Sequence, residues 1–517
     1  MKKIFTKDKY PIILLIATSF LFIFFNTINI NLPILEQHSF RQTQTALTAY
    51  YFKKNGFSFD YETPVVGYPW SLPFEFPIYQ WLVALFSSIF NQSLTVSGRT
   101  VSLVFGFLSV IPIYKTLKLL EIPRNISLYI LSLFLSTPVY IFWSGTFMIE
   151  STALFFTLLY IYFSIKLCKN SNENYLNFFI FFTLTLALLQ KPTSVIPPAI
   201  FFSVIHCIKF YKKTDKKINF IYIVLSHAVA VIVLYLWTSY GDSLKELNPF
   251  ASQHLTSNAL SSWNWGNLEQ RFSFKIFWWR TIIKRTIFEN TFHLFGVVII
   301  IFSLLICKLN QKILIGSCLI LFMSHFLIFT NLHIRHNYYQ YSNIIYYLVA
   351  LGISMNTLHS YLIKNNKYLK TFLIRKTSLI LPIAFSVITL FGYYSFYKVE
   401  YAKARFQVID SNNNRVIEIS NFIKNNTDKE LPIIIFGNDW SSTYAFYSER
   451  RALTVQCCDI DSDVLNNLDY YLPQMKIGAI INCYDGIEKK PELIDNIIIN
   501  KYNMVQKNVS GCNIYTP

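Results

Sequence analysis

Residues 11–31 read PIILLIATSFLFIFFNTININ and contain no charged side chain. A helix needs about 20 such residues to cross the hydrocarbon layer of a bilayer, so this stretch decides the class of the fold. The segment before it is basic, with Lys2, Lys3, Lys7 and Lys9, as in a secretory signal peptide. The apolar run is longer than a typical signal sequence and no small-residue cleavage site follows it, so we expect a retained helix.

The rest of the chain repeats this apolar character. Of its 517 residues, 53% are hydrophobic and only 14% are charged, whereas soluble globular proteins are about 25% charged. The sequence therefore predicts a mostly α-helical, polytopic membrane protein of about eleven spans. The candidate spans are residues 11–31, 99–118, 125–143, 151–167, 174–190, 193–209, 218–238, 291–308, 313–332, 341–362 and 377–397.

The formal net charge of +18 comes from short lysine clusters between apolar runs. Such clusters are typical of membrane topology signals, so we do not expect a nucleic acid partner. An excess of Lys and Arg marks cytoplasmic loops. We therefore expect a cytoplasmic N-terminus, outer loops at residues 32–98 and 239–290, and an extracytoplasmic C-terminal domain on a protein of the inner (cytoplasmic) membrane. Residues 275–285 of the second outer loop are basic and break the rule, but long loops carry less weight in it.

The first outer loop contains FEFPIYQWLVALFSSIF, residues 74–90. This segment is apolar and aromatic but short for a span, so we expect an amphipathic helix in the outer membrane interface. The alternative is that it crosses the bilayer, which would invert every later loop and place the basic clusters outside.

The composition changes near residue 398, which predicts a transmembrane domain over residues 1–397 and a small α/β domain over residues 398–517. NNNRVIEISNFIKNNT (412–427) has the pattern of an amphipathic helix, whereas LPIIIFGNDW (431–440) and KIGAIINCYD (476–485) are typical of buried strands. We expect one or two disulfides in this domain, although the pairing cannot be deduced from sequence. The candidate cysteines are Cys457, Cys458, Cys483 and Cys512.

Ionisable and polar side chains gather at the predicted outer ends of the helices, where their burial near lipid is costly and indicates function. Cations at that boundary suit a phosphate, and a carboxylate nearby suits removal of a proton from an attacking hydroxyl or amine. The set contains the carboxylates Glu36, Glu62, Glu75 and Glu150, the cationic or basic residues Arg41, Lys191, Arg335 and His336, and the polar residues His38, Gln44, Tyr339 and Gln340. No metal-ligand spacing is present, so a divalent ion beside the phosphate is chemically possible but has no support in the sequence.

The joint order of several motifs resembles the GT-C class of polyprenyl-phosphate-dependent glycosyltransferases. Within that class it is most similar to the branch of the protein O-mannosyltransferases and the lipid A aminoarabinose transferases. The matching stretches are HSFRQTQTALTAYYF (38–52), ETPVVGYPWSLPFEFPIYQWLVALF (62–86), GRTVSLVFGFLS (98–109), FMIESTALFFTLLYIYF (147–163), KPTS (191–194), HNYYQY (336–341) and FGNDWSSTYAFYSERRA (436–452). The resemblance implies an inverting transferase that takes a sugar from a polyprenyl monophosphate and uses an acidic side chain of the first outer loop.

One position departs from this resemblance. Many relatives carry an acidic residue where this chain has Gln44, and glutamine cannot act as a base. The resemblance then favours Glu150, which matches a second acidic position of the relatives, followed by Glu75; Glu36 and Glu62 are weaker candidates. Arg41, Lys191, Arg335 and His336 would hold the donor phosphate, and Gln44, His38, Tyr339 and Gln340 would contact substrate.

The sequence thus predicts a transferase with a polyprenyl-phosphate-sugar donor, a glycan, lipid or protein acceptor, and membrane lipids as partners. Neither the sugar nor the acceptor can be read from it. A transporter or flippase of lipid-linked sugars is one alternative, but it would predict internal repeats and mid-span ionisable groups. A catalytically silent relative that binds lipid-linked sugars is another, and Gln44 keeps it open.

Overall fold

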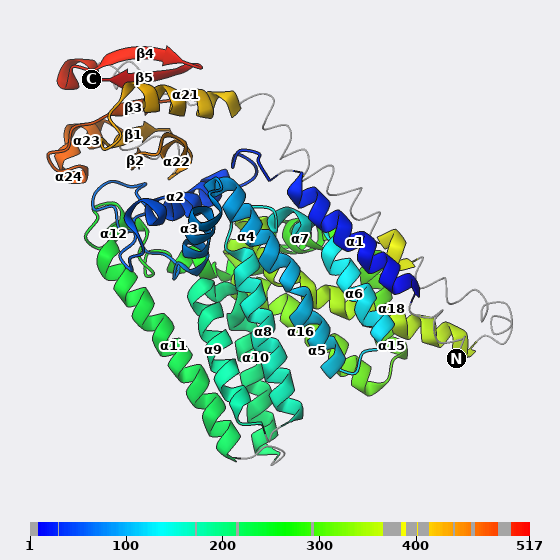
Figure 1. Ribbon diagram of the computed structural model, residues 1–517. Helices are drawn as coiled ribbons and strands as arrows, with labels where there is room; N and C mark the ends of the chain where they lie inside the picture. The colour runs from blue at the N-terminus through cyan, green and yellow to red at the C-terminus, as the bar shows by residue number, and fades with distance from the viewer. Residues whose placement is uncertain are drawn as a thin grey trace.

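The computed structural model describes residues 9–28, 30–170, 173–212, 217–290, 294–365, 384–388, 401, 413–437, 440–455, 461–483 and 498–517. The fold is mostly helical, as predicted. Long helices pack side by side, and a small sheet with its own helices lies over one end of them, next to helix α2 (Ser39–Asn55) and helix α3 (Ile78–Phe90) (Figure 1).

Within the described residues, six helical segments are long and apolar enough to cross a membrane. They are Lys9–Thr27 (α1), Leu94–Leu119 (α4, Leu94–Leu108, with α5, Val110–Leu119), Glu150–Lys169 (α8), Pro192–Tyr211 (α10), Asn219–Lys245 (within α11, Lys217–Lys245) and Leu309–Ile328 (α16). The multi-pass architecture is thereby confirmed, whereas the count of about eleven stays a prediction.

Most of the other predicted spans are helical but shorter or less apolar. They correspond to α6 (Arg124–Ser136) with α7 (Pro138–Trp143), α9 (Tyr175–Gln190), α15 (Phe295–Ile306) and α18 (Ile344–Asn365). The last predicted span, residues 377–397, lies largely outside the described residues.

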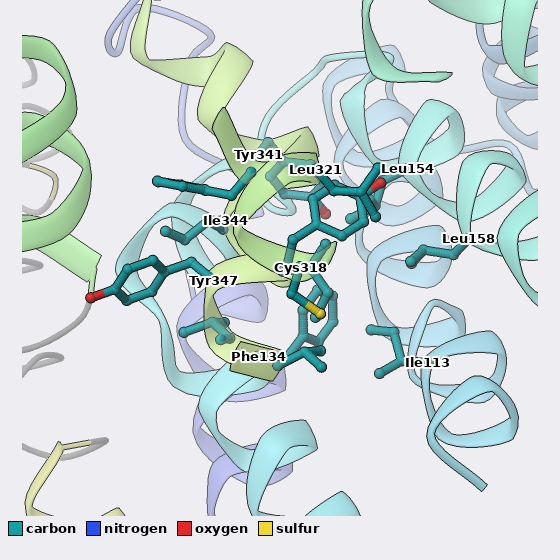
Figure 2. Packing of buried hydrophobic residues seen from close by; sticks show 14 of the residues in the cluster. Ile113, Phe134, Leu154, Leu158, Cys318, Leu321, Tyr341, Ile344 and Tyr347 are labelled. Atoms are coloured by element: carbon teal, nitrogen blue, oxygen red, sulfur yellow. The ribbon is translucent and has the colours of Figure 1, made fainter. Parts of the chain in front are cut away.

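A hydrophobic core holds α5, α6, α8, α16 and α18 together. Its buried side chains include Ile113, Phe134, Leu158 and Leu321, and Figure 2 shows several of them converging from different helices. Tyr341 is part of this core. Its hydroxyl shares hydrogen bonds with Ser144 (2.7 Å) and Ser151 (3.1 Å), which fix the segment that carries it against α8.

Helix α3 packs between α2 and α4. At 13 residues it is too short to span a bilayer, which needs about 20. Trp81, Leu85 and Ile89 are exposed and recur every four residues, so they form an apolar stripe on one helix face. This stripe suits the predicted interfacial helix, whose placement in the membrane stays a prediction.

The second predicted outer loop is largely helical. Helix α11 continues to Lys245, and four further segments follow it. These are α12 (Ala251–His254), α13 (Ser261–Trp265), α14 (Leu268–Phe272) and the π-helix η1 (Phe274–Phe288).

The C-terminal region contains a five-stranded sheet of order β2-β1-β3-β5-β4. Strands β1 (Ile433–Phe436) and β3 (Ala479–Asn482) confirm the two predicted strands, and helix α21 (Asn413–Asn426) confirms the predicted helix. Strand β1 runs parallel to both β2 and β3, whereas β5 is antiparallel to β3 and β4. The remaining elements are β2 (Ala452–Val455), β4 (Val505–Val509), β5 (Cys512–Thr516), α22 (Thr443–Ser448), α23 (Asp461–Asn466) and α24 (Leu468–Tyr471).

Cys483 and Cys512 form a disulfide beside β3 and β5, in agreement with the expected cross-linking of this region. Cys457 and Cys458 lie outside the described residues, as does the predicted domain boundary near residue 398.

Candidate active site

A cavity of about 380 Å³ lies where the first loop, the α9–α10 junction and the 3-10 segment η2 (Asn337–Ser342) meet. Its wall is mostly apolar, with a small number of charged and amide side chains, which is the usual make-up of a ligand pocket. The lining residues are Arg41, Phe74, Glu75, Ile149, Gln190, Lys191, Pro192, Thr193, Ile196, Leu234, Asn264, Trp265, Phe329, Leu332, Tyr338 and Tyr339.

Arg41 enters the cavity from the first turn of α2. The residue before this helix, His38, adopts a left-handed conformation (φ 56°), and its carbonyl accepts a hydrogen bond from the Arg41 backbone N–H (3.0 Å). The Arg41 guanidinium donates to Oε1 of Gln44 (2.6 Å) and to Oε2 of Glu75 (2.8 Å). Burial disfavours the charged form, but the adjacent Glu75 carboxylate outweighs it and raises the pKa of Arg41 above its ordinary value, so this residue is a permanent cation.

Glu75 is held on both sides. Its second carboxylate oxygen accepts a hydrogen bond from Nε2 of Gln80 (2.7 Å), in the first turn of α3. The hydroxyl of Tyr61 donates to the backbone carbonyl of Glu75 (2.8 Å) and accepts from the N–H of Phe74 (2.9 Å). Side chain and backbone are therefore both fixed at the cavity wall.

Lys191 reaches the cavity because the chain turns sharply between two helices. It has an extended backbone (φ −163°, ψ 94°), the conformation that a following proline favours, and Pro192 starts α10. The Lys191 ammonium donates a hydrogen bond to Oε1 of Glu150. It also lies 4.2 Å from the ring centre of Tyr339 and 4.9 Å from that of Tyr338, within the range of cation–π attraction.

Glu150, the carboxylate that the sequence ranked first, is only 3% exposed. It starts α8, where the helix dipole favours a negative charge. Its Oε2 has no hydrogen-bond partner among the described residues. Glu150 does not line the cavity: Lys191 does, and Glu150 is its buried partner.

Three further polar atoms in this wall are buried without a hydrogen-bond partner in the described part of the chain: both amide atoms of Gln190 and the hydroxyl of Thr193. Buried polar groups are normally satisfied by protein or by ordered water, so these atoms are available to water or to a polar ligand beside Lys191.

His38, His336 and Tyr338 form an aromatic cluster. The ring centres of His38 and His336 lie 4.9 Å apart, and Tyr338 contacts both rings. Burial lowers the pKa of His38 to about 4, against the raising effect of a hydrogen bond with Asn337. Burial, with the nearby His38 and several cations, lowers the pKa of His336 to about 3. Both imidazoles are therefore neutral at pH 7, so His336 can offer a hydrogen bond to a phosphate but no charge.

The other predicted residues lie outside the cavity wall, except Tyr339. Arg335 is exposed, with its guanidinium 5.6 Å from the ring centre of Trp263. Gln44 accepts its hydrogen bond from Arg41 without lining the cavity. Gln340 is buried and donates to the carbonyl of His333 (3.3 Å).

Two of the candidate carboxylates are engaged elsewhere. Glu36 forms a buried ion pair with Arg99, one guanidinium nitrogen lying 2.8 and 2.9 Å from its two oxygens. Glu62 accepts two hydrogen bonds from Arg451 (2.8 and 2.9 Å), which precedes β2. The structure therefore brings Arg41, Glu75, Lys191 and Tyr339 together and leaves Glu36 and Glu62 away from them.

Two glutamines of this site were not predicted. Gln80 is a lone polar residue within the apolar run PIYQWLVALF, and Gln190 ends an apolar helix. An isolated amide in each apolar stretch was the available signal.

No group of three His, Cys, Asp or Glu residues that could hold a metal ion occurs within the described ranges. The carboxylates of Glu75 and Glu150 each face a cation, Arg41 and Lys191. In this arrangement a divalent ion would have to displace these cations to reach either carboxylate.

Comparison with known proteins agrees with this architecture. The sequence profile of the dolichyl-phosphate-mannose-protein mannosyltransferase family matches residues 72–237, a stretch that includes Glu75, Glu150 and Lys191. No curated protein matches the chain.

Several solved structures share the fold at low sequence identity. The structure of ArnT from Cupriavidus metallidurans bound to undecaprenyl phosphate is 10% identical, with a TM-score of 0.62 over 97% of each chain. The oligosaccharyltransferase AglB from Archaeoglobus fulgidus, in complex with an inhibitory peptide and a dolichol-phosphate, is also 10% identical, with a TM-score of 0.55 over 91% of this chain and 69% of its own. Arabinofuranosyltransferase AftD from Mycobacteria has a TM-score of 0.51 at 10% identity, over 97% of this chain and 39% of its own.

The resemblance stated from the sequence motifs is thereby confirmed: the chain is a multi-pass membrane protein with the GT-C glycosyltransferase fold, and its residues 72–237 match the dolichyl-phosphate-mannose-protein mannosyltransferase family.

Proposed function

We propose that this protein is an integral membrane glycosyltransferase that moves a sugar from a polyprenyl monophosphate to an acceptor at the outer face of the cytoplasmic membrane. The observation that carries the proposal is the meeting of two cations, Arg41 and Lys191, with the carboxylate of Glu75 in one cavity wall. The solved relatives bound to undecaprenyl phosphate and dolichol-phosphate support a lipid-phosphate donor.

In this proposal, the donor phosphate binds between Arg41 and Lys191. These cations come from different elements, and each now pairs with a carboxylate, Glu75 or Glu150. A phosphate offers several strong acceptor oxygens and suits the planar guanidinium, so it would replace Glu75 as the partner of Arg41. The Lys191 ammonium has three N–H donors, so it would bind the phosphate while it stays paired with Glu150. The unpartnered amide of Gln190 and hydroxyl of Thr193 would supply further hydrogen bonds.

The reaction is a direct displacement at the anomeric carbon of the sugar. The acceptor oxygen or nitrogen forms a bond to that carbon as the bond to the phosphate oxygen breaks, so the configuration inverts. The electron pair leaves on the phosphate, whose growing charge Arg41 and Lys191 stabilise, and the acceptor proton passes to a carboxylate.

We assign the role of base to Glu75. It lines the cavity, whereas Glu150 is buried behind Lys191. Once Arg41 turns towards the phosphate, the Glu75 carboxylate is free to take the acceptor proton. Glu150 then keeps Lys191 at the phosphate. This assignment reverses the order that the sequence resemblance favoured.

The proposed orientation follows the lysine-rich loops, which favour a cytoplasmic N-terminus. The disulfide between Cys483 and Cys512 supports placing the C-terminal sheet outside, because disulfides persist mainly in oxidising compartments. Residues 398–517 would then form the extracytoplasmic domain over the cavity.

The test is sugar transfer by the purified protein in detergent, given a panel of polyprenyl-monophosphate sugars, with release of polyprenyl phosphate as the readout. We expect one donor of the panel to be consumed. If a donor binds and none is consumed, the protein is a silent binding relative, in line with the Gln44 that stands where many relatives are acidic. A protein that neither binds nor consumes any donor would contradict the proposal.

A further inference from the structure

The loop that leads to Glu75 is joined to the C-terminal sheet. Strand β2 is one edge of that sheet, and Val66 pairs with Leu453 of β2 in an antiparallel bridge. The N–H groups of Ala452 and Thr454 donate to the carbonyls of Pro64 (3.0 Å) and Val65 (2.8 Å). The first loop therefore adds a short extra strand to the sheet edge, a mode otherwise used to bind extended peptides.

Further bonds hold the two ends of this added strand. The N–H of Gly67 donates to the carbonyl of Ala452 (3.1 Å), and that of Tyr68 donates to the carbonyl of Tyr471 (2.9 Å). Gly67 has φ 86°, and a Cβ there would lie 2.9 Å from the Tyr471 oxygen, so only glycine fits this close approach. At the other end, the bidentate pair of Arg451 with Glu62 joins the loop to the residue before β2.

Asn248, in the segment between α11 and α12, also bonds to the same loop. It follows α11 and is fully buried. Its Nδ2 lies 3.1–3.3 Å from four successive backbone carbonyl oxygens, those of residues 66–69. Its Oδ1 accepts from the N–H groups of Phe250 (3.0 Å) and Ala251 (2.8 Å), at the start of α12. Both the nitrogen and the oxygen of the Asn248 side-chain amide are therefore hydrogen-bonded.

Of the charged groups that line the cavity, only Glu75 belongs to this loop. Arg41 lies on α2 and Lys191 lies at the α9–α10 junction. We infer that Asn248 and the edge strand β2 form a clamp that positions Glu75 for catalysis without contributing to donor-phosphate binding. This inference rests on the proposed function, in which Glu75 is the base. Asn248 is a positioning residue, since it acts on Glu75 through the loop.

If the clamp positions only Glu75, weakening it should lower the rate of sugar transfer and leave donor binding unchanged. Asn248→Asp keeps the size of the side chain but places an oxygen against the four loop carbonyls. In the purified full-length protein, we expect the rate of polyprenyl phosphate release to fall at least about tenfold, which corresponds to about 1.4 kcal/mol. Binding of undecaprenyl phosphate should stay within about twofold of the unchanged protein, because Arg41 and Lys191 are not on the loop.

A second readout does not depend on catalysis. Hydrogen exchange of the amides in residues 62–71 should be at least about tenfold faster in Asn248→Asp, with no change in α8 or α10. Arg451→Gln, which weakens the clamp from the sheet side, should act in the same direction. Asn426→Asp is the matched control: Asn426 is exposed on α21, and its side chain bonds locally among the described residues, to the carbonyl of Phe422. This variant should behave like the unchanged protein.

The inference fails if Asn248→Asp exchanges and turns over like the control. It also fails if undecaprenyl phosphate binding is lost together with turnover, because the residue then supports the whole site and not Glu75 alone. If Glu75→Gln retains transfer, or the unchanged protein transfers no sugar, the proposed function fails separately. In either case the exchange of residues 62–71 still decides whether the clamp exists.

Discussion

The guanidinium of Arg41 lies 2.8 Å from the carboxylate of Glu75, a residue 34 positions further along the chain. Arg41 projects from the first turn of α2, and Glu75 lies in the loop just before α3. Both side chains line the same cavity. The permanent cation can bind a phosphate in this cavity, and the carboxylate can accept a proton there in the same reaction.

The first prediction concerns Arg41. Hydrogen bonds to charged groups contribute about 1.5–3 kcal/mol, so Arg41→Gln should weaken the binding of undecaprenyl phosphate by about 10- to 100-fold. Arg335→Gln is the matched control. Because Arg335 is exposed and stacks on Trp263 outside the cavity wall, its loss should change binding by less than about threefold. Equal losses in the two variants would show that the phosphate is held elsewhere.

The second prediction concerns Lys191 and Glu150. Removing one partner of a buried ion pair costs about 3–5 kcal/mol, so Lys191→Met and Glu150→Gln should each lower the melting temperature in detergent. The double variant should be less destabilised than the sum of the two, with a coupling of about 1–3 kcal/mol. Strict additivity would mean that the two side chains do not form a pair.

The third prediction separates a structural carboxylate from a catalytic one. Glu36 is buried against Arg99, so Glu36→Gln should cost about 3 kcal/mol of stability. Undecaprenyl phosphate binding should persist at temperatures where this variant is folded. A variant of normal stability that has lost sugar transfer would instead place Glu36 in the reaction.

The fourth prediction concerns pH. Both His38 and His336 have lowered pKa values in the folded protein, about 4 and about 3, against about 6.5 in an unfolded chain. Between these values the unfolded state binds protons that the folded state does not, so stability falls as the pH drops below about 6.5. We expect the melting temperature to decrease by roughly 2–4 °C from pH 7.5 to pH 5. His336→Gln should reduce this decrease, and an unchanged slope would exclude His336 as a contributor.

The sequence predicts the membrane architecture well because each span is a long local signal. The sheet is harder to predict. Strand β1 is four buried apolar residues and is easily recognised, whereas β4, which reads VQKNV, is mostly exposed at the sheet edge. A polar edge strand has no hydrophobic pattern, since its place is set by pairing with β5.

The site was predictable only in part for a related reason. Local sequence places Arg41, Glu75 and Lys191 at helix ends, and the structure brings them together. The local sequence does not indicate that Glu36 pairs with a residue 63 positions away, or that Glu62 pairs with one 389 positions away. Long-range ion pairs of this kind leave no local pattern, so these carboxylates looked equivalent to Glu75.

The most direct measurement is the rate of polyprenyl phosphate release by Glu75→Gln, compared with the unchanged protein and with Glu150→Gln, together with undecaprenyl phosphate binding by all three. If Glu75 is the base, its loss should lower the rate by about 10²- to 10⁴-fold while the lipid phosphate still binds. Glu150→Gln should weaken binding and retain a larger share of the rate. Normal release by Glu75→Gln, with release abolished in Glu150→Gln, would contradict the assignment and make Glu150 the base.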